Sequence, residues 1–334
     1  MSHQFQLELL TALKAVRQAA VACRSVQASI TTESLDKKDK SPVTVADFAS
    51  QAIICRQLQV DFPCDPVIGE EGAAELRQLS GQQFLERVVQ ECAVSGLKAT
   101  AQQVCDWIDR GGASQYSPRF WTLDPIDGTK GFLRKEQYAI SLALIVDGRI
   151  EVGVLGCPNM PFDGQPEGCG VLAWAVRGHG AWMQPLSAPN SAATQISVTT
   201  VSQTAEMRFC ESVESGHSSH DWSGLIAAEL GICLEPVRMD SQCKYLAVAR
   251  GDADLYLRLP TRKGYQEKIW DHAGGILVVE EAGGRVTDIN GTPPDFSHGA
   301  SLVANEGMVV TNSKAHETII AAIARHMPQE IAKS

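Results

Sequence analysis

The spacing of hydrophobic residues predicts two helices near the N-terminus. Leucine, alanine and valine recur every three or four positions early in the chain, so we expect a long helix over residues 5–30. A charged stretch and then Pro42 interrupt this pattern, and we expect the second helix to begin near Asp47. Residues 72–115 carry mixed helical signals and many Gln and Glu side chains, which indicates an excursion on the surface.

Short apolar runs predict strands in the middle of the chain. Residues 66–69 form an apolar run that ends on a glycine, and residues 120–123 form another. Two strand-like segments meet at Asp147-Gly148, a dipeptide that is typical of a hairpin turn, so we expect a β-hairpin over residues 138–155. The further strands expected are residues 171–176 and 195–200.

The second half of the chain alternates helical and strand patterns beyond about residue 205. The helices expected are residues 222–230, 272–281 and 315–325, and the strands are residues 253–259 and 286–288. Hairpins followed by alternating elements predict an α+β or α/β protein built of stacked helix and sheet layers. A cluster of Pro and Ser at 185–195 predicts a seam between an N-terminal α+β domain, residues 1–190, and a C-terminal α/β domain, residues 191–334.

The composition narrows the classes of partner. The chain has 334 residues, with 39 acidic and 29 basic side chains, a formal net charge of −10 and no basic run. A protein that binds nucleic acid through phosphate contacts needs the opposite balance, so no nucleic acid polymer is expected as a partner. No segment approaches the roughly 18 uninterrupted apolar residues of a membrane span, so no membrane partner is expected either.

The cysteines and the N-terminus indicate in which cellular compartment the protein is expected. Ten cysteines are spread over the chain without a C-x-x-C pair. A chain of this length needs no disulfides to build a core, so we expect mostly reduced, buried cysteines. The N-terminus runs into a helical pattern and not into an apolar signal core, which favours a cytoplasmic location. An organelle reached through a transit peptide that this sequence lacks is the alternative.

The segment 124–131, with the sequence DPIDGTKG, is the most informative for chemistry. It follows a predicted strand, so Asp124 and Asp127 are expected in a tight turn at the end of that strand. With the carbonyl of Ile126, these carboxylates can offer three hard oxygen ligands to divalent cations. The alternative is an ordinary Asp-Pro, Asp-Gly turn whose carboxylates cap a helix.

Two further acidic sites favour the same chemistry. Glu70 and Glu71 follow a predicted strand, and Asp271 stands at the start of an apolar helix, either as its N-cap or as a metal ligand. Four carboxylates crowded together without cations are energetically costly. The candidate ligands are oxygens and no His/Cys cluster suggests zinc, so Mg²⁺ is the expected cation.

Four motifs carry a resemblance to a known family. In order and spacing, they resemble the lithium-sensitive, magnesium-dependent phosphatases of the inositol monophosphatase superfamily. The motifs are SPVTVAD (41–47), GEE (69–71), DPIDGTK (124–130) and WDHAGG (270–275). Further segments look most similar to the 3′(2′),5′-bisphosphate nucleotidase branch, and these are KSPVTVAD (40–47), GHSSH (216–220), DSQCKY (240–245) and YQEKIWDH (265–272).

The resemblance covers nearly the whole chain and implies a fold and a metal site. The implied fold is a five-layer αβαβα sandwich, and the implied cofactor is Mg²⁺, as two or three ions. The implied metal ligands are Glu70, Asp124, Ile126 through its carbonyl, Asp127 and Asp271. By the same resemblance, Asp47 polarises Thr129, whose hydroxyl orients the attacking water together with Glu70. These three residues are the implied catalytic group.

The resemblance also implies the contacts to the substrate. The residues implied are Thr129, His217, Ser241, Lys244, Arg258 and Asp271. The cations Lys244 and Arg258 would face a second phosphate, which makes sense in an otherwise acidic protein. Taken alone, Lys244 could equally be a solvated charge and Arg258 a structural one.

The activity implied by the resemblance is that of a phosphomonoesterase. Its expected partner is a small phosphorylated nucleotide: 3′-phosphoadenosine 5′-phosphate, hydrolysed to AMP and phosphate, with phosphoadenylyl sulfate as a possible second substrate. The protein is expected to be a monomer or a weak homodimer. Two alternatives stay open, namely an inositol polyphosphate 1-phosphatase, which shares the metal site, and a non-catalytic nucleotide sensor.

Overall fold

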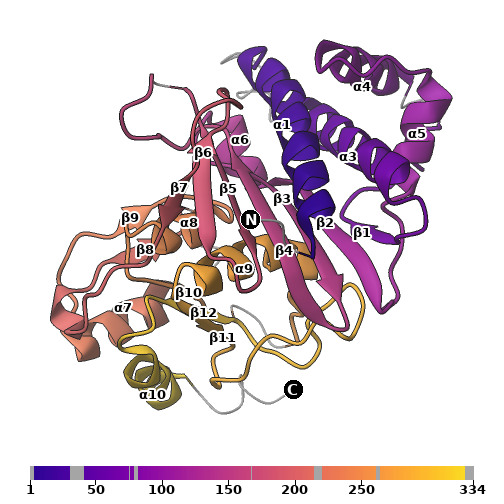
Figure 1. Ribbon diagram of the computed structural model, residues 1–334. Coiled ribbons are helices and arrows are strands. Elements are labelled where there is room, and N and C mark those ends of the chain that lie inside the picture. Colours follow the sequence, from indigo (N-terminus) through magenta and orange to yellow (C-terminus); the bar gives the residue numbers. More distant parts are fainter. Residues whose placement is uncertain are drawn as a thin grey trace.

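Sheets and helical layers alternate through the molecule (Figure 1). The computed structural model describes residues 4–30, 41–74, 76–78, 82–166, 168–213, 220–260 and 264–327. The α-helices of this part of the chain are α1 (Gln6–Ala28), α3 (Ser41–Asp61), α4 (Gln82–Val94), α5 (Ala101–Asp109), α6 (Thr129–Leu133), α7 (His220–Leu230), α8 (Cys243–Ala249), α9 (Ala273–Glu281) and α10 (His316–His326). The short 3₁₀ helices are η2 (Thr204–Glu206) and η3 (Ile269–Asp271).

The larger sheet has seven strands that follow one another in chain order. They are β1 (Val67–Gly69), β2 (Arg119–Asp127), β3 (Ala139–Val146), β4 (Arg149–Cys157), β5 (Val171–Val176), β6 (Ala181–Pro185) and β7 (Thr194–Ile196). Strand β1 runs parallel to β2, and each later pair is antiparallel. Strands β3 and β5 are almost continuously apolar because helices cover both faces of this sheet.

The smaller sheet has five strands in the order β11-β12-β10-β8-β9. They are β8 (Phe209–Glu211), β9 (Val237–Arg238), β10 (Leu255–Arg258), β11 (Arg285–Thr287) and β12 (Met308–Thr311). Successive side chains of β10 point to opposite faces, so Leu255 and Leu257 pack with α7 and α10 while Tyr256 packs with α8. This alternation buries both faces of the small sheet.

The order of the layers confirms the expected five-layer αβαβα sandwich. Helices α1 and α3 cover one face of the larger sheet, α8 and α9 lie between the two sheets, and α7 and α10 cover the outer face of the smaller sheet (Figure 1). Helices α4 and α5 lie outside these layers and pack on α3. The surface excursion expected between residues 72 and 115 is therefore helical and peripheral.

Most of the expected elements are confirmed. The helices expected at 5–30, 222–230, 272–281 and 315–325 are observed as α1, α7, α9 and α10, with ends that differ by at most two residues. The hairpin is formed by β3 and β4, and its turn residues Asp147 and Gly148 both have positive φ, 49° and 74°. This is the conformation that the Asp-Gly dipeptide predicts.

Two boundaries were wrong. Helix α3 begins at Ser41 and not near Asp47, with Pro42 as its second residue. Proline is tolerated there because the N–H groups of the first helical turn have no partner within the helix. The strand expected at 195–200 ends at Ile196, where its pairing with β6 stops.

The seven-stranded sheet continues past the expected seam, because β7 pairs with β6 through Ile196, Gln195 and Thr194. The division of the chain at residue 190 stays a prediction.

Eight of the ten cysteines are buried, as expected for packing groups. Within the described ranges, no helix has the length and apolar character that a membrane crossing requires.

Candidate active site

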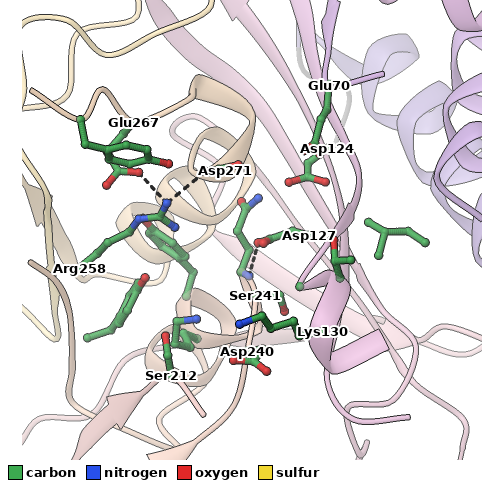
Figure 2. A pocket seen from close by; sticks show the side chains of 18 of the residues that line it. Glu70, Asp124, Asp127, Lys130, Ser212, Asp240, Ser241, Arg258, Glu267 and Asp271 are labelled. Atoms are coloured by element: carbon green, nitrogen blue, oxygen red, sulfur yellow. Dashed lines mark hydrogen bonds and ion pairs between the residues drawn. The ribbon is translucent and has the colours of Figure 1, made fainter. Parts of the chain in front are cut away.

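A pocket of about 590 Å³ is lined from both sheets. Its acidic wall consists of Glu70, which follows β1, and of Asp124 and Asp127 at the end of β2. Its basic wall consists of Lys244 on α8 and Arg258 on β10. Figure 2 shows the acidic side chains on one side of this space and Arg258 on the other, with Asp271 between them.

The two aspartates of the acidic wall belong to an irregular strand. We expected a turn after the strand, but β2 itself extends to Asp127. Asp124 pairs with Ser141 and Asp127 pairs with Ala139, so β2 carries one residue more than β3 in this interval. In a regular strand, residues three positions apart face opposite sides of the sheet. The bulge therefore turns both carboxylates toward the pocket.

Thr129 is placed by a glycine in the left-handed region. Gly128 precedes α6 with a φ of 91°, a conformation that residues with a side chain rarely adopt. A Cβ at this position would also lie 2.9 Å from the Cβ of Ser241. Thr129 is the first residue of α6 and is exposed where it lines the pocket.

The carboxylates of the acidic wall lie among like charges, with Asp124 buried, Asp127 half-buried and Glu70 exposed toward the pocket. Desolvation of the Glu70 carboxyl group by its surroundings, and then nearby negative charges led by Asp271, raise the pKa of Glu70 to about 8. Burial and Asp271 raise the pKa of Asp127 to about 6. Burial and Glu70 raise the pKa of Asp124 well above its ordinary value. The charged forms of these groups are thus strongly disfavoured unless a cation joins them.

The same group of side chains fits a hard divalent cation. Oδ1 of Asp124 is buried and has no hydrogen-bond partner among the described residues. An unpartnered buried carboxylate oxygen is costly, and a cation would remove that cost. The residues that could hold such an ion are Glu70, Asp124, Ile126 through its carbonyl, Asp127 and Asp271, all of which line the pocket. Their donors are oxygens, which suit Mg²⁺, Ca²⁺ or Mn²⁺.

Asp47 lies on α3 and is buried, but it is not one of the side chains that line the pocket. Burial first, and then the charges of Glu71 and Glu70, raise the pKa of Asp47 well above its ordinary value. Asp47 therefore lies near the acidic wall, on the side of the wall that faces away from the pocket. Its action on Thr129 stays a prediction.

A second group of possible ligands is already bonded within the chain. Ligand atoms of Glu267, Asp271 and His272 lie within 4.8 Å of one another. The Arg258 guanidinium pairs with Oε2 of Glu267 at 2.7 Å and with Oδ2 of Asp271 at 3.3 Å (Figure 2). Nε2–H of His272 donates to Glu267 at 3.2 Å, and the Tyr245 hydroxyl donates to Nδ1 of His272 at 2.7 Å. Glu267 and His272 therefore hold Arg258 in place.

Asp271 reaches the pocket from η3 and not from the start of α9. Helix α9 begins at Ala273, with His272 at its N-cap position. Asp271 is the last residue of η3, so the interpretation of Asp271 as the N-cap of that helix was wrong. The tight 3₁₀ turn separates Asp271 from the helix and leaves its carboxylate beside Arg258.

Lys244 is a buried cation on the basic wall. The residue is 5% exposed, and its Nζ lies 5.0 Å from the ring centroid of Tyr256. Within the described residues, Lys244 forms no ion pair with a carboxylate. A ring face offsets only part of the cost of burying an ammonium group. Lys244 is therefore suited to receive an anionic group from a ligand.

Gln242 joins the two walls and was missed by the sequence analysis. Its backbone N–H donates to Oδ2 of Asp127 at 2.6 Å, and its side-chain amide donates to the carbonyl of Trp270 at 2.8 Å. Glu267 and Tyr256 were missed as well. Nothing in the local sequence signals these contacts, because each one joins segments that only the tertiary fold brings together.

The pocket gathers most of the candidates from the sequence. Those that line it are Glu70, Asp124, Ile126, Asp127, Thr129, Ser241, Lys244, Arg258 and Asp271. Ser241 has a positive φ of 69° at the turn into α8, which presents it to the pocket beside Gly128. His217 lies outside the described residues.

Comparisons with known proteins give matches over nearly the whole chain. A 3'(2'),5'-bisphosphate nucleotidase of Schizosaccharomyces pombe is 43% identical, with 96% of each chain covered. A protein of the same name from Emericella nidulans is 41% identical, with 96% of this chain and 98% of the relative covered. The solved structure of an inositol monophosphatase from Anabaena has a TM-score of 0.63 at 20% identity, with 98% of this chain and 99% of the other covered, and so supports the fold. The pattern of the inositol monophosphatase family matches residues 4–328, and the chain belongs to that family.

Proposed function

We propose that this chain hydrolyses the 3′-phosphate of 3′-phosphoadenosine 5′-phosphate to give AMP and phosphate, with Mg²⁺ as cofactor. One observation carries the proposal: an acidic wall in which the buried Asp124 has an oxygen without a hydrogen-bond partner faces, across one pocket, the buried ammonium of Lys244, which has no ion-pair partner in the described part of the chain. The relatives named 3'(2'),5'-bisphosphate nucleotidase support the same class of substrate. Phosphoadenylyl sulfate carries the same 3′-phosphate and is the second substrate of the proposal.

The acidic wall is the metal site of this proposal. The residues that would hold two or three Mg²⁺ ions are Glu70, Asp124, Ile126, Asp127 and Asp271. When bound, the cations supply charge neutralisation for the phosphoryl group and make a water molecule more acidic. For the chain itself, bound cations would offset the desolvation and then the repulsion that raise the pKa values of Glu70 and Asp127.

Three side chains would position the attacking water. Glu70 accepts a hydrogen bond from that water, and the Thr129 hydroxyl orients it toward the phosphorus atom. Thr129 is supported in this role by its exposure to the pocket next to Asp127. Asp47 orients Thr129 from behind the wall, which is supported by its burial near Glu70 and Glu71.

The basic wall would bind the 5′-phosphate, and the substrate contacts proposed are Thr129, His217, Ser241, Lys244, Arg258 and Asp271. Lys244 supplies the main charge, because its ammonium has a ring and not a carboxylate as neighbour. Arg258 adds a second cation whose orientation is fixed by Glu267 and Asp271. Charge-assisted hydrogen bonds to phosphate are stronger than neutral ones, so two cations give the second phosphate a large share of the binding energy.

A phosphate-release assay over a small panel tests this function. The panel contains 3′-phosphoadenosine 5′-phosphate, phosphoadenylyl sulfate, a nucleoside 3′-monophosphate and inositol 1,4-bisphosphate, each with and without Mg²⁺. We expect the highest kcat/KM for the bisphosphate nucleotide. Preference for the inositol bisphosphate would contradict the substrate, and tight nucleotide binding without phosphate release would mark a sensor.

A further inference from the structure

We propose that Gln51, a buried residue of α3 outside the pocket, is a positioning residue that holds the Glu70–Glu71 segment in its metal-binding conformation. The inference deepens the proposed function and rests on it, because it concerns the same metal site. Gln51 does not line the pocket, and its side chain is 0% exposed. It would act through the backbone of Glu71 and not through the substrate.

The amide of Gln51 is bonded to both backbone groups of one residue. Its Nε2 donates to the carbonyl of Glu71 at 2.6 Å, and its Oε1 accepts the N–H of Glu71 at 3.1 Å. Nε2 donates a further hydrogen bond to the carbonyl of Ile108 at 2.9 Å, at the end of α5. Both N–H groups and the carbonyl of the amide are thus used. The two hydrogen bonds to Glu71 fix the segment after β1 in the way that the backbone of a neighbouring strand would.

Two glycines leave the space that this side chain fills. A Cβ at Gly69 would lie 2.7 Å from Oε1 of Gln51, and a Cβ at Gly111 would lie 2.5 Å from its Nε2. The backbone N–H of Gly69 also donates to the carbonyl of Gly111 at 2.8 Å. The amide therefore occupies a slot between two backbone segments that only glycine allows to approach so closely.

The same face of α3 reaches both halves of the acidic wall. Gln51 lies one helical turn after Asp47, so both residues face the Glu70–Glu71 segment. Ser50 donates from its Oγ to the carbonyl of Pro125 at 3.0 Å, inside the bulge of β2. Adjacent residues of one rigid helix thus hold the two chain segments that carry Glu70 and the aspartates. Loss of a group that orients metal ligands in this way typically lowers metal affinity about 10- to 100-fold.

The same helix provides a matched control. Gln57 is also buried, and its Nε2 donates to Oδ2 of Asp61 at 2.6 Å, away from the pocket. Changing either glutamine to methionine keeps the length of the side chain and removes its hydrogen bonds. Both changes are expected to lower the midpoint of urea unfolding, because each leaves buried polar groups without partners. Only the change at Gln51 should also lower the affinity for Mg²⁺.

The experiment measures Mg²⁺ binding by titration calorimetry and kcat and KM by phosphate release, for the parent, Gln51→Met and Gln57→Met. For Gln51→Met we expect a Kd for Mg²⁺ that is about 10- to 100-fold higher, with KM for the bisphosphate nucleotide unchanged at saturating Mg²⁺. Gln57→Met should keep the parent affinity. Equal Mg²⁺ affinity in all three proteins would overturn the inference while leaving the proposed function intact.

A second variant keeps the test decisive if Gln51→Met does not fold. Gly111→Ala displaces the Gln51 amide, a flexible side-chain end, from a backbone position that alanine can adopt, and leaves every carboxylate unchanged. Weaker Mg²⁺ binding in Gly111→Ala supports the inference, and unchanged binding overturns it. A parent protein that neither binds Mg²⁺ nor releases phosphate would overturn the proposed function itself and the inference with it.

Discussion

The acidic wall and the basic wall each contain a buried charged side chain, Asp124 on one and Lys244 on the other, but the two walls balance their charge differently. On the acidic wall, Glu70, Asp124 and Asp127 have one another as neighbours, and their pKa values are all raised. On the basic wall, Arg258 is paired with two carboxylates, and Lys244 lies over a tyrosine ring. The cations that act on the acidic wall lie across the pocket, where Lys244 and Arg258 lower the pKa of Asp127 without outweighing burial and Asp271. The basic wall supplies most of its own counter-charges.

This difference indicates which charges are available to a ligand. A charge that is already paired gains little from a new partner, whereas a buried charge without one gains much. The acidic wall therefore offers most of its charge to cations. On the basic wall, Lys244 has more to gain from a phosphate than Arg258, although the sequence alone treats the two cations as equivalent.

Removing divalent cations should abolish activity. Without them, the acidic wall has nothing to balance its repulsion, and a phosphate group has no counter-charge on that side of the pocket. Phosphate release should fall to background after dialysis against EDTA and return when Mg²⁺ is added in excess. The far-ultraviolet circular dichroism spectrum should be unchanged, as a control for folding. Full turnover in EDTA would mean that the acidic wall is not a catalytic metal site.

Replacing Thr129 should separate water positioning from metal binding. Thr129→Ala keeps every carboxylate of the acidic wall, so the affinity for Mg²⁺ measured by calorimetry should stay at the parent value. We expect kcat to fall roughly 10²-fold, the usual scale for a group that assists proton transfer. Thr129→Ser restores a hydroxyl and should recover much of that loss. A Thr129→Ala protein as fast as the parent would refute the role of both Thr129 and Asp47.

The acidic wall could be predicted from the sequence because its residues stand at the ends of strands or directly after them. Asp124 and Asp127 are three positions apart, and the only element needed to interpret them is the strand that ends at Asp127. The turn at Asp147-Gly148 was predictable for a similar reason, since its positive φ angles are a local property of the dipeptide. What the spacing could not predict is the bulge in β2, because its extra residue is defined only by the pairing with β3.

The basic wall was harder to predict because its contacts are tertiary. The pairing of Arg258 with Glu267 joins β10 to the segment before η3, and neither segment carries a local signal of the other. The same is true of Gln51, a polar residue on a largely apolar helix face whose partners lie near residues 71 and 108. Its position four residues after Asp47 was visible in the sequence, but its hydrogen bonds were not.

Lys244 and Arg258 should respond differently to neutralisation. Lys244→Met removes a charge without an ion-pair partner, so it should lower kcat/KM for the bisphosphate nucleotide by about one to two decades, the value of a charge-assisted contact of about 1.5–3 kcal/mol. Hydrolysis of a nucleoside 3′-monophosphate, which lacks the 5′-phosphate, should change little. Arg258→Met removes the guanidinium that pairs with Glu267 and Asp271, so it should lower both activities and also the free energy of unfolding.

The ratio of the two activities is the measurement that distinguishes these cases. A Lys244→Met protein that loses both activities equally would show that Lys244 is structural. Loss of neither activity would place the 5′-phosphate elsewhere and would favour an inositol phosphate as substrate. Lys244→Arg serves as the control, because it keeps the charge while changing its shape.

The smallest expected effect is on stability, and the two walls should give it opposite pH dependence. The pKa of Glu70 is raised from 4.5 to about 8, so without cations the folded chain retains a proton that the unfolded chain releases. Stability should therefore decrease as pH rises from about 5 to about 8, and added Mg²⁺ should remove this decrease.

Glu267 should have the opposite effect on the pH dependence of stability. Burial alone would raise its pKa, but the hydrogen bond from His272 and the charge of Arg258 outweigh burial and lower the pKa to about 2. Its contribution is complete above pH 4.5 and is lost as pH falls toward 2.

Thermal unfolding in EDTA at a series of pH values tests both directions. For the parent, Tm should be highest near pH 5 and should fall by a few degrees toward pH 8, a modest shift because the entropy of unfolding is large in a chain of this size. Glu70→Gln cannot lose a proton, so it should make the decrease on the alkaline side shallower, with the remainder due to Asp47, Asp124 and Asp127, and should leave the acid side unchanged. Glu267→Gln should weaken the acid dependence and leave the alkaline side unchanged. If Tm rose between pH 5 and pH 8 in EDTA, the carboxylates of the acidic wall would have to be balanced by charges within the chain, and the contrast between the walls would be wrong.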